Sequence, residues 1–339
     1  MPERRAPAGE CRGGEGTRRP EAGHCSGGGA GQGAWPALTV VIPAAGDRDG
    51  VQRCVDALVT AAPPGLEIIV SCCAAAGTQT DDAPAAAAAQ VRVIRPGGAS
   101  AAAARTAGLA AAAGEYVGFL EPGDEVEPGW AQALLAAAAA AGRPAIVKGE
   151  GLSVHKGREL SAPHACAAMA RHTPLHWYGA LGSAIYRRDL VQGHDLRFAA
   201  DCHAGEAGFQ VQAVVAAMLG GGRIALCPQA VCRHRFRSGD PQSTTPLGRQ
   251  EAAGSLAVHA ALHELFVQQA SVLPPQGVGW QYCTWLGALF ALTRRARYPQ
   301  DAAAANALAQ RLNRECPCSD ALERERRARE FGLTSPPPS

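Results

Sequence analysis

Short runs of aliphatic and β-branched residues alternate with helix-forming segments through the N-terminal half of the chain. Such runs lie at 38–42, 66–70, 91–94 and 115–120. Because they are largely apolar, they predict strands buried on both faces of a parallel sheet. Helices are predicted at 51–60, 84–90, 100–113 and 129–141, with Ser100 capping the third and Gly114 ending it. This order predicts an α/β fold with a doubly wound, mostly parallel sheet and flanking helices.

The pattern is less regular in the second half of the chain. After Ile146 we expect a short element at 184–188, a helix at 206–219 and a strand at 223–226. From about residue 250 the pattern is helical and includes a charged segment at 322–330. The predicted organisation is a disordered Gly/Arg/Pro-rich tail at 1–34, an α/β domain at 35–240, a helical C-terminal region at 241–332 and a disordered tail at 333–339.

Composition argues against several classes of function. Lys and Arg number 32, Asp and Glu number 30, and the two signs are mixed along the chain, so no nucleic-acid partner is predicted. No apolar stretch reaches the roughly 18–20 residues that cross a bilayer, so no transmembrane segment is expected, and peripheral membrane contact is left open. The N-terminus lacks the apolar stretch of a secretory signal, and the twelve cysteines are interpreted as reduced thiols. These features predict a cytoplasmic protein.

Several segments, taken in order, resemble family 2 glycosyltransferases of the GT-A fold. They are 38–43, 67–70, 104–109 (ARTAGL), 114–124 (GEYVGFLEPGD) and a later group at 185–188, 196–198, 205–206 and 223–225. The resemblance covers roughly Leu38 to Ser238. It implies an enzyme of the hexosyltransferase type that transfers a sugar from a nucleotide-sugar donor to a glycan or lipid-linked acceptor by an inverting reaction.

The turn Glu121-Pro122-Gly123-Asp124 stands where the family has an Asp-x-Asp turn that holds Mg²⁺ or Mn²⁺. Hard cations prefer carboxylate oxygens, and they neutralise the charge of the diphosphate leaving group. The resemblance therefore implies Glu121 and Asp124 as metal ligands, with Gly123 where the second acid is usual. The alternative interpretation is a solvent-facing turn, since Glu-Pro-Gly-Asp favours a turn by itself.

An inverting transfer needs a base that takes the proton from the acceptor hydroxyl. The family places a Glu-Asp pair at the start of a helix, and here the pair reads Glu206-Ala207. Glu206 is therefore the implied catalytic base, and Asp201 is a distant second. A helix N-terminus favours an ionised carboxylate, so the same position also suits a residue that only stabilises the helix.

Four further residues are the implied substrate contacts. Pro43 and Cys73 follow the first two strands, where the family frames the nucleotide base; Arg105 lies on a helix beside the donor pocket, and Arg235 lies in the basic run 233–237. A plain surface arginine and a solvated loop are the alternatives for the last two. A zinc site is disfavoured because the cysteines and histidine at 227, 232 and 234 lack Cys-x2-Cys spacing.

Two functional hypotheses follow. The first is an active glycosyltransferase with the residues named above. The second is a catalytically inactive relative that acts as a binding or scaffold protein, because several family positions are substituted: Ala45, Cys72, Cys73, Gly123 and Ala207. An unrelated dinucleotide-binding enzyme is disfavoured, since no Gly-x-Gly-x-x-Gly follows the first strand.

Overall fold

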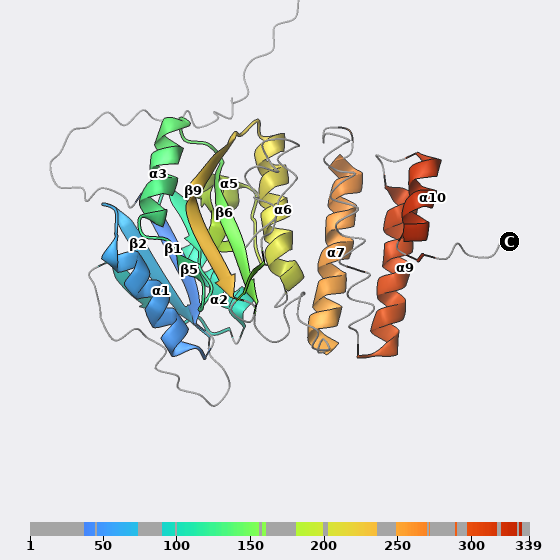
Figure 1. Cartoon of the computed structure of the whole chain (residues 1–339), viewed down its shortest axis with the longest axis horizontal. Coiled ribbons are helices and arrows are strands. Elements are labelled where there is room, and N and C mark those ends of the chain that lie inside the picture. Colours follow the sequence, from blue (N-terminus) through green and yellow to red (C-terminus); the bar gives the residue numbers. More distant parts are fainter. Residues whose placement is uncertain are drawn as a thin grey trace, which may run out of the picture. The chain divides into compact units, whose positions relative to one another are not determined.

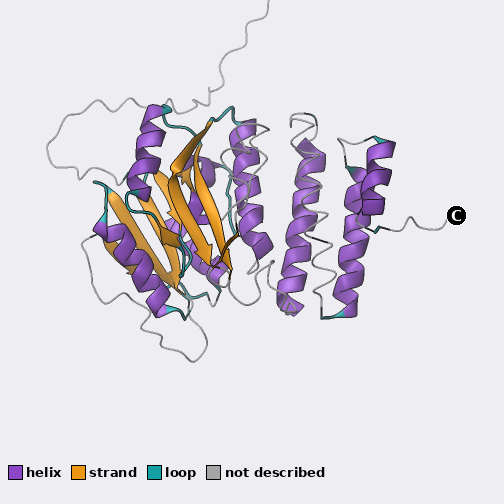
Figure 2. Cartoon of the chain, viewed as in Figure 1, coloured by secondary structure: helices purple, strands orange, loops and turns teal. Residues whose placement is uncertain are grey.

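The structure is a computed structural model that describes residues 37–44, 46–73, 90–98, 100–155, 158–160, 181–198, 203–235, 249–269, 271, 289, 297–316, 320–330 and 332–333. Strands and helices alternate through the first part of these ranges, and helices alone follow (Figures 1 and 2). The N-terminal tail, residues 334–339 and the helix predicted at 84–90, apart from Gln90, lie outside the described residues. The division into domains stays a prediction.

Four parallel strands form one half of the sheet. They are β1 (Leu38–Ala44), β2 (Leu66–Cys72), β3 (Val91–Ile94) and β4 (Tyr116–Phe119), in the order β3-β2-β1-β4. β1 pairs with β2 over its whole length. Every residue of β1 and of β4 is buried, as the apolar runs predicted. The carboxyl ends of β1, β2 and β4 therefore meet at one edge, where the chain leaves toward its loops.

The other half of the sheet is mixed in direction. It contains β8 (Ala184–Arg187), β6 (Ile146–His155), β9 (Ile224–Arg235) and β5 (Glu125–Val126), while β7 (Arg158–Leu160) pairs with β6. β8 runs antiparallel to both β4 and β6, whereas β6 and β9 are parallel. The predicted α/β fold is confirmed, but the pattern did not reveal β5, β6 or β7. β6 carries Lys148 and Glu150 at buried positions, so it has no unbroken apolar run.

Alternate residues of the parallel strands face two layers of helices. On one face, Val40 and Ile42 share a core with α1 (Arg48–Thr60) and α3 (Trp130–Ala140). On the other face, Val41 and Ile69 share a core with α2 (Ala101–Ala111), α5 (Arg188–Gly193) and α6 (His203–Leu219). The hydroxyl of Ser100 accepts a hydrogen bond from the Ala103 amide at 3.1 Å, so the predicted N-cap is confirmed.

The C-terminal region is helical, as predicted. It contains α7 (Arg249–Gln269), α9 (Pro299–Glu315) and α10 (Ala321–Glu330). Leu262 and Phe266 of α7 belong to the same apolar core as Phe209 of α6, so α7 packs on the α/β part through buried side chains. Among the described residues, no helix combines the length and the hydrophobicity needed to cross a bilayer.

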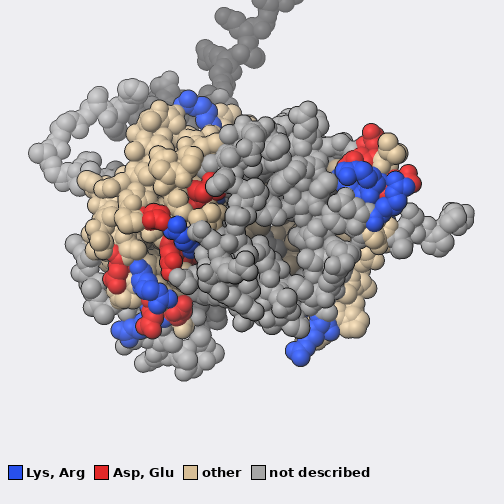
Figure 3. Space-filling view, in the orientation of Figure 1, with Lys and Arg blue, Asp and Glu red and all other residues tan. Residues whose placement is uncertain are grey.

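Charged side chains of both signs lie next to one another on the face seen in Figure 3, at the places that α1 and α10 have in Figure 1. On α10 they form pairs within the helix, such as Arg326 with Glu323 and Arg329 with Glu325. Exposed pairs of this kind stabilise a helix by only a few tenths of a kcal/mol each. This part of the surface therefore has no concentrated charge of one sign.

A buried histidine is expected to make the fold sensitive to mild acid. His259 of α7 is 8% exposed, and its Nδ1 donates to the carbonyl oxygen of Ser255 at 2.7 Å. Burial lowers the pKa of His259 below its ordinary value of 6.5, because burial penalises the imidazolium. Between the lowered pKa and 6.5 the unfolded chain binds the proton more readily, so the free energy of unfolding falls as the pH drops below 6.5.

Denaturation with urea at a series of pH values from about 8 to 5 measures this loss. His259→Gln removes the titrating group and is expected to flatten the dependence in this range, even if it lowers stability at every pH. A variant that loses stability with falling pH as steeply as the wild type would contradict the assignment to His259.

Candidate functional site

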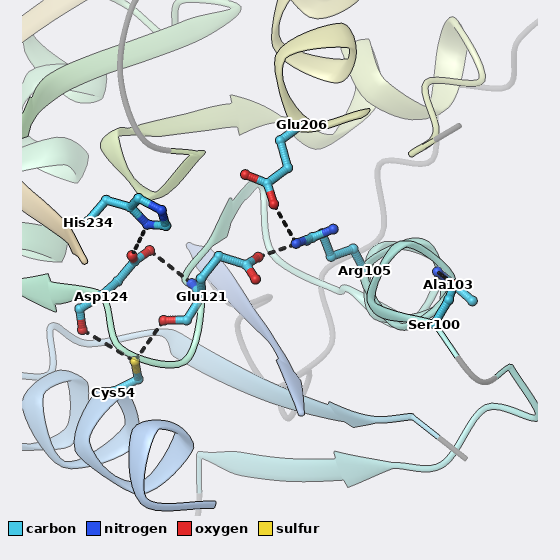
Figure 4. A network of polar contacts seen from close by, with 8 residues as sticks. All are labelled: Cys54, Ser100, Ala103, Arg105, Glu121, Asp124, Glu206 and His234. Atoms are coloured by element: carbon cyan, nitrogen blue, oxygen red, sulfur yellow. Dashed lines mark hydrogen bonds and ion pairs between the residues drawn. The ribbon is translucent and has the colours of Figure 1, made fainter. Parts of the chain in front are cut away.

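The turn after β4 sits where the carboxyl ends of the parallel strands meet (Figure 4). The Asp124 amide donates to the Glu121 carbonyl oxygen at 2.8 Å, and the Glu121 amide donates to Asp124 Oδ2 at 2.9 Å. Gly123 has φ of +104°, a conformation that residues with a Cβ rarely adopt. The glycine that replaces an acid here therefore permits a tight turn in which the Asp124 carboxylate caps the backbone. The predicted solvent-facing turn is wrong for Asp124, which is 4% exposed.

A buried thiol on α1 donates hydrogen bonds to the same turn. Cys54 Sγ donates to the carbonyl oxygens of Glu121 and Asp124, at 3.3 and 3.5 Å. Burial, reinforced by the negative charge of Asp124, raises the pKa of Cys54 to about 12. Cys54 is therefore a protonated donor at neutral pH and not a nucleophile. The sequence pattern gave no sign of this role, since Cys54 lies in an ordinary helical segment.

Asp124 also faces a histidine from β9, in the mixed half of the sheet. Its Oδ1 lies 2.7 Å from Nδ1 of His234, and the two side chains are 1% and 17% exposed. The antiparallel pairing of β5 with β9, which sets Glu125 opposite Arg233, brings these residues together across 110 positions of sequence. Gly182 lies behind Asp124, where a Cβ would come within 3.1 Å of Oδ2. Asp124 is therefore buried between Gly182 and His234.

Arg105 of α2 joins the other two predicted acids. Its Nε lies 2.7 Å from Glu121 Oε1, and one terminal nitrogen lies 2.6 Å from Glu206 Oε1. Arg105 is 4% exposed, and its guanidinium carbon lies 5.4 Å from the centre of the Phe198 ring. The alternative of a plain surface arginine is therefore wrong. A single buried cation links the turn after β4 to the first turn of α6 (Figure 4).

The close approach of α2 to the sheet explains how Arg105 reaches both acids. Gly108 lies one turn after Arg105, and a Cβ at Gly108 would be 2.3 Å from Cγ1 of Val41. The absence of a side chain lets α2 lie directly on β1. Glu206 and Glu121 keep 17% and 12% of their side chains exposed. The arginine therefore holds both acids in place while each retains some access to solvent.

The remaining predicted contacts lie at the same edge of the sheet. Pro43 is buried near the end of β1, and Cys73 is 6% exposed just after β2, with its amide donating to the Ala44 carbonyl oxygen at 2.8 Å. Arg235 ends β9, directly after His234. Ala207 is exposed beside Glu206, and Asp201 lies outside the described residues. The structure thus brings the termini of the predicted elements together, and the roles of these residues stay predictions.

The predicted pair of metal ligands, Glu121 and Asp124, does not share one donor set, because Glu121 turns to Arg105 while Asp124 turns to His234. In the described part of the chain, no group of three or more His, Cys, Asp or Glu residues is placed to hold a metal ion. Asp124 and His234 do fit a divalent cation as a pair, since oxygen and imidazole nitrogen face each other. Mg²⁺ often takes only one or two protein ligands and completes its shell with water and substrate phosphates.

The zinc arrangement that was disfavoured from spacing is not formed by the two cysteines near His234. Cys227 and Cys232 are fully buried in the apolar core with Ala230, and burial raises the pKa of both thiols. All six cysteines in the described residues are free thiols: Cys54, Cys72, Cys73, Cys227, Cys232 and Cys316. A neutral, desolvated thiol is a poor metal ligand, so Cys227 and Cys232 act as packing groups.

Fold and site together define a class of protein. An open α/β sheet carries an acidic turn after its central strand β4, a histidine near the end of β9, and a carboxylate at a helix start on the same edge. In open α/β sheets, ligands bind outside the carboxyl ends of the strands. This is the arrangement of a GT-A type glycosyltransferase domain.

Comparisons with known proteins agree with this class. Residues 39–192 match the model of glycosyl transferase family 2. Among solved structures, S. aureus TarS 1–349 in complex with UDP-GlcNAc has 16% identity and a TM-score of 0.50, with 87% of this chain and 90% of that chain covered. The same protein in complex with UDP has 15% identity and a TM-score of 0.48, with 87% and 88% covered. A search of curated protein sequences gave no match. At these identities the structural likeness shows the fold alone.

Proposed function

We propose that this protein transfers a sugar from a nucleoside-diphosphate sugar to a hydroxyl acceptor. The observation that carries the proposal is the convergence of Glu121, Asp124 and Glu206 on one edge of the sheet, linked through Arg105 and next to His234. The match of residues 39–192 to family 2 supports the reaction class. The complex of TarS with UDP-GlcNAc supports a nucleotide sugar as the donor, because that protein has the same fold.

In the proposed reaction, an acceptor oxygen bonds to the anomeric carbon of the donor as the bond from that carbon to the diphosphate oxygen breaks. Glu206 takes the acceptor proton, and the nucleoside diphosphate leaves. Arg105 holds Glu206 in place before the transfer. Attack by an acceptor on the face opposite the leaving group gives inversion, which we propose for this enzyme.

The diphosphate leaving group carries negative charge that the site must stabilise. We propose that Asp124 and His234 hold Mg²⁺ or Mn²⁺ when the donor is bound, since a cation can replace the proton that these side chains now share. The bound cation would supply electrostatic stabilisation of the leaving group. In this proposal Glu121 orients Arg105 and is not a metal ligand, although the sequence predicted that it would be one.

The finer features of the activity belong to the same proposal. The acceptor is a glycan or a lipid-linked sugar, the donor sugar is a hexose derivative, and the reaction takes place in the cytoplasm as a step of polysaccharide synthesis. Pro43 and Cys73 lie where the nucleotide base would approach the sheet, and Arg235 lies beside His234 where a phosphate would approach.

One observation favours the rival function, an inactive relative that only binds. The salt bridge to Arg105 occupies Oε1 of Glu206, one of the two carboxylate oxygens that could take the acceptor proton. Ala207, next to Glu206, supplies no second carboxylate. In that case the same edge of the sheet would bind a nucleotide or a nucleotide sugar without catalysing its transfer or hydrolysis.

A binding measurement combined with a turnover measurement separates the two functions. Calorimetry with a panel of nucleotide sugars, with and without Mn²⁺, identifies the donor, and release of nucleoside diphosphate reports its transfer or hydrolysis. Glu206→Gln keeps the size and a hydrogen-bond acceptor for Arg105 but removes the base. We expect it to bind the donor as the wild type does and to turn over about 10²–10⁴-fold more slowly.

Glu325→Gln on α10 is the matched control, since its side chain is 63% exposed and distant in sequence from the site. It is expected to keep full turnover. Donor binding by the wild type without any turnover would favour the rival function. If no member of the panel binds, with or without the metal, the proposal of a nucleotide-sugar donor is wrong.

A further inference from the structure

Three arginines surround a cavity at the edge of the sheet opposite the site described above. The cavity has a volume of about 330 Å³, and its lining includes Arg143, Arg187, Arg188, Glu115 and Asp189. Glu115 directly precedes β4, whereas Glu121 follows it, so six residues of largely extended chain, roughly 20 Å, separate the two edges. The cavity is therefore separate from the turn that carries Glu121 and Asp124.

Each of the three guanidinium groups is fixed through its Nε nitrogen. Arg143 Nε donates to Glu115 Oε1 at 2.5 Å, Arg187 Nε to Asp189 Oδ1 at 2.5 Å, and Arg188 Nε to the Gly114 carbonyl oxygen at 2.7 Å. One terminal nitrogen of Arg187 donates to the Arg143 carbonyl oxygen at 3.2 Å. Within the described part of the chain, the other terminal nitrogens of these arginines make no hydrogen bond.

The backbone holds this group of arginines in position. Arg143 has φ of +58°, which is uncommon for a residue with a Cβ, and its amide donates to the Ala138 carbonyl oxygen at 2.9 Å at the end of α3. The Arg188 amide donates to the Glu115 carbonyl oxygen at 2.9 Å. Side chains from the ends of α3, β8 and α5 are thus brought together with the residue before β4.

The charge of this group leaves an excess of one positive unit, since three arginines face two carboxylates. Two terminal nitrogens of one guanidinium donate in parallel, a geometry that matches two oxygens of a phosphate. The volume lies at the lower end of the range for small-molecule sites, roughly 300–1,000 Å³. These features select a compact dianion over an extended or neutral ligand.

A second cavity adjoins the first and differs from it in chemistry. Its volume is about 270 Å³, and it shares Arg187 and Asp189 with the first. Apart from His194, the rest of its lining is small or apolar, with Ala145, Leu190, Ala217 and Gly222 among its residues. An uncharged group attached to a phosphate in the first cavity would contact these small and apolar residues in the second.

We propose that these two cavities form a binding site for a small phosphate monoester, with its phosphate held by Arg143, Arg187 and Arg188 and its uncharged part beside Leu190 and Gly222. The inference does not rest on the proposed transfer reaction, because the two sites share no described residue. A phosphorylated ligand bound here contacts the ends of β4 and β8, whose other ends carry the turn with Glu121 and the segment with Gly182.

Titration calorimetry with glucose 6-phosphate and, separately, with inorganic phosphate tests the proposal on the full chain. We expect glucose 6-phosphate to bind, and each of Arg143→Gln and Arg188→Gln to weaken its binding about tenfold, since a charge-assisted hydrogen bond contributes at least 1.4 kcal/mol. Arg326→Gln, which removes an exposed arginine from α10, is expected to leave the affinity unchanged. Tighter binding of the sugar phosphate than of inorganic phosphate is expected if the second cavity accepts the sugar.

Several results would overturn the assignment. One is the absence of binding of both probes at about 10 mM, a concentration that nearly saturates a millimolar site. Another is an equal loss in Arg326→Gln and in the two cavity variants, which would indicate attraction to net charge alone. Equal affinities for the two probes would overturn the part played by the second cavity. Arg143→Gln decides the matter if Arg188→Gln fails to fold, because the Arg143 side chain is 69% exposed and carries little of the packing.

Discussion

Replacing Arg105 with alanine is expected to lower the free energy of unfolding by about 3 kcal/mol, the largest stability effect expected of any single charged residue at the site. The substitution leaves the Glu121 and Glu206 carboxylates facing each other with no cation between them. Burial makes such unpaired charges costly, and the partial exposure of both acids places the effect near the lower end of the usual 3–5 kcal/mol. Denaturation with urea measures the change.

The control for this prediction removes an arginine that has an exposed partner. Arg326→Ala is expected to change the free energy of unfolding by less than about 1 kcal/mol, because its pair with Glu323 is on the surface of α10. Removing all three charges at once, as Arg105→Met with Glu121→Gln and Glu206→Gln, is expected to recover much of the lost stability. If Arg105→Ala were no more harmful than Arg326→Ala, the buried bridge would not contribute to stability.

Arg105→Lys distinguishes shape from charge at the same position. A lysine ammonium keeps the positive charge but lacks the planar fork with which Nε meets Glu121 and a terminal nitrogen meets Glu206. It is therefore expected to restore only part of the stability lost in Arg105→Ala. This comparison belongs to the same set of denaturation curves.

The parallel half of the fold could be predicted from sequence because its signals are local. β1 and β2 are largely apolar runs, and Ser100 caps α2, whereas Gly114 lies three residues beyond its last residue, Ala111. β6 lacks such signals because it buries Lys148 and Glu150, and only the first residues of β9 were predicted. The pairing of these two long strands shifts register between Gly149 and Glu150, which only tertiary contacts determine.

The acids of the site were also predictable, but their partners were not. Glu121, Asp124 and Glu206 occupy the positions where family members have acids. The pairing of Asp124 with His234 depends on β5 meeting β9, and β5 is only two residues long. Arg105 lies in a helix of alanines, where no contrast between apolar and polar positions shows which side faces the core. Its burial therefore followed from the packing of Gly108 on Val41, not from a pattern.

A large loss of activity is expected from Asp124→Asn. The asparagine keeps the size of the side chain and an oxygen that can accept from the Glu121 amide, so the turn is expected to stay intact. It removes the negative charge that would hold a divalent cation together with His234. We expect a loss of about 10²–10³-fold in kcat, the effect of removing one group that stabilises developing charge in a transition state. Release of nucleoside diphosphate at saturating donor, across a range of Mn²⁺ concentrations, measures it.

A fall in activity alone would not separate a role in charge stabilisation from a role in folding, because the Asp124 side chain is 1% exposed. The thermal midpoint and the donor affinity without metal must therefore stay close to the wild-type values in the same variant. Asp49→Asn supplies the matched control, since it makes the identical chemical change at an exposed position in the first turn of α1. Full activity in Asp124→Asn, or an unchanged response to Mn²⁺, would show that the pair formed by Asp124 and His234 is a structural support for the turn and not the place where the cation binds.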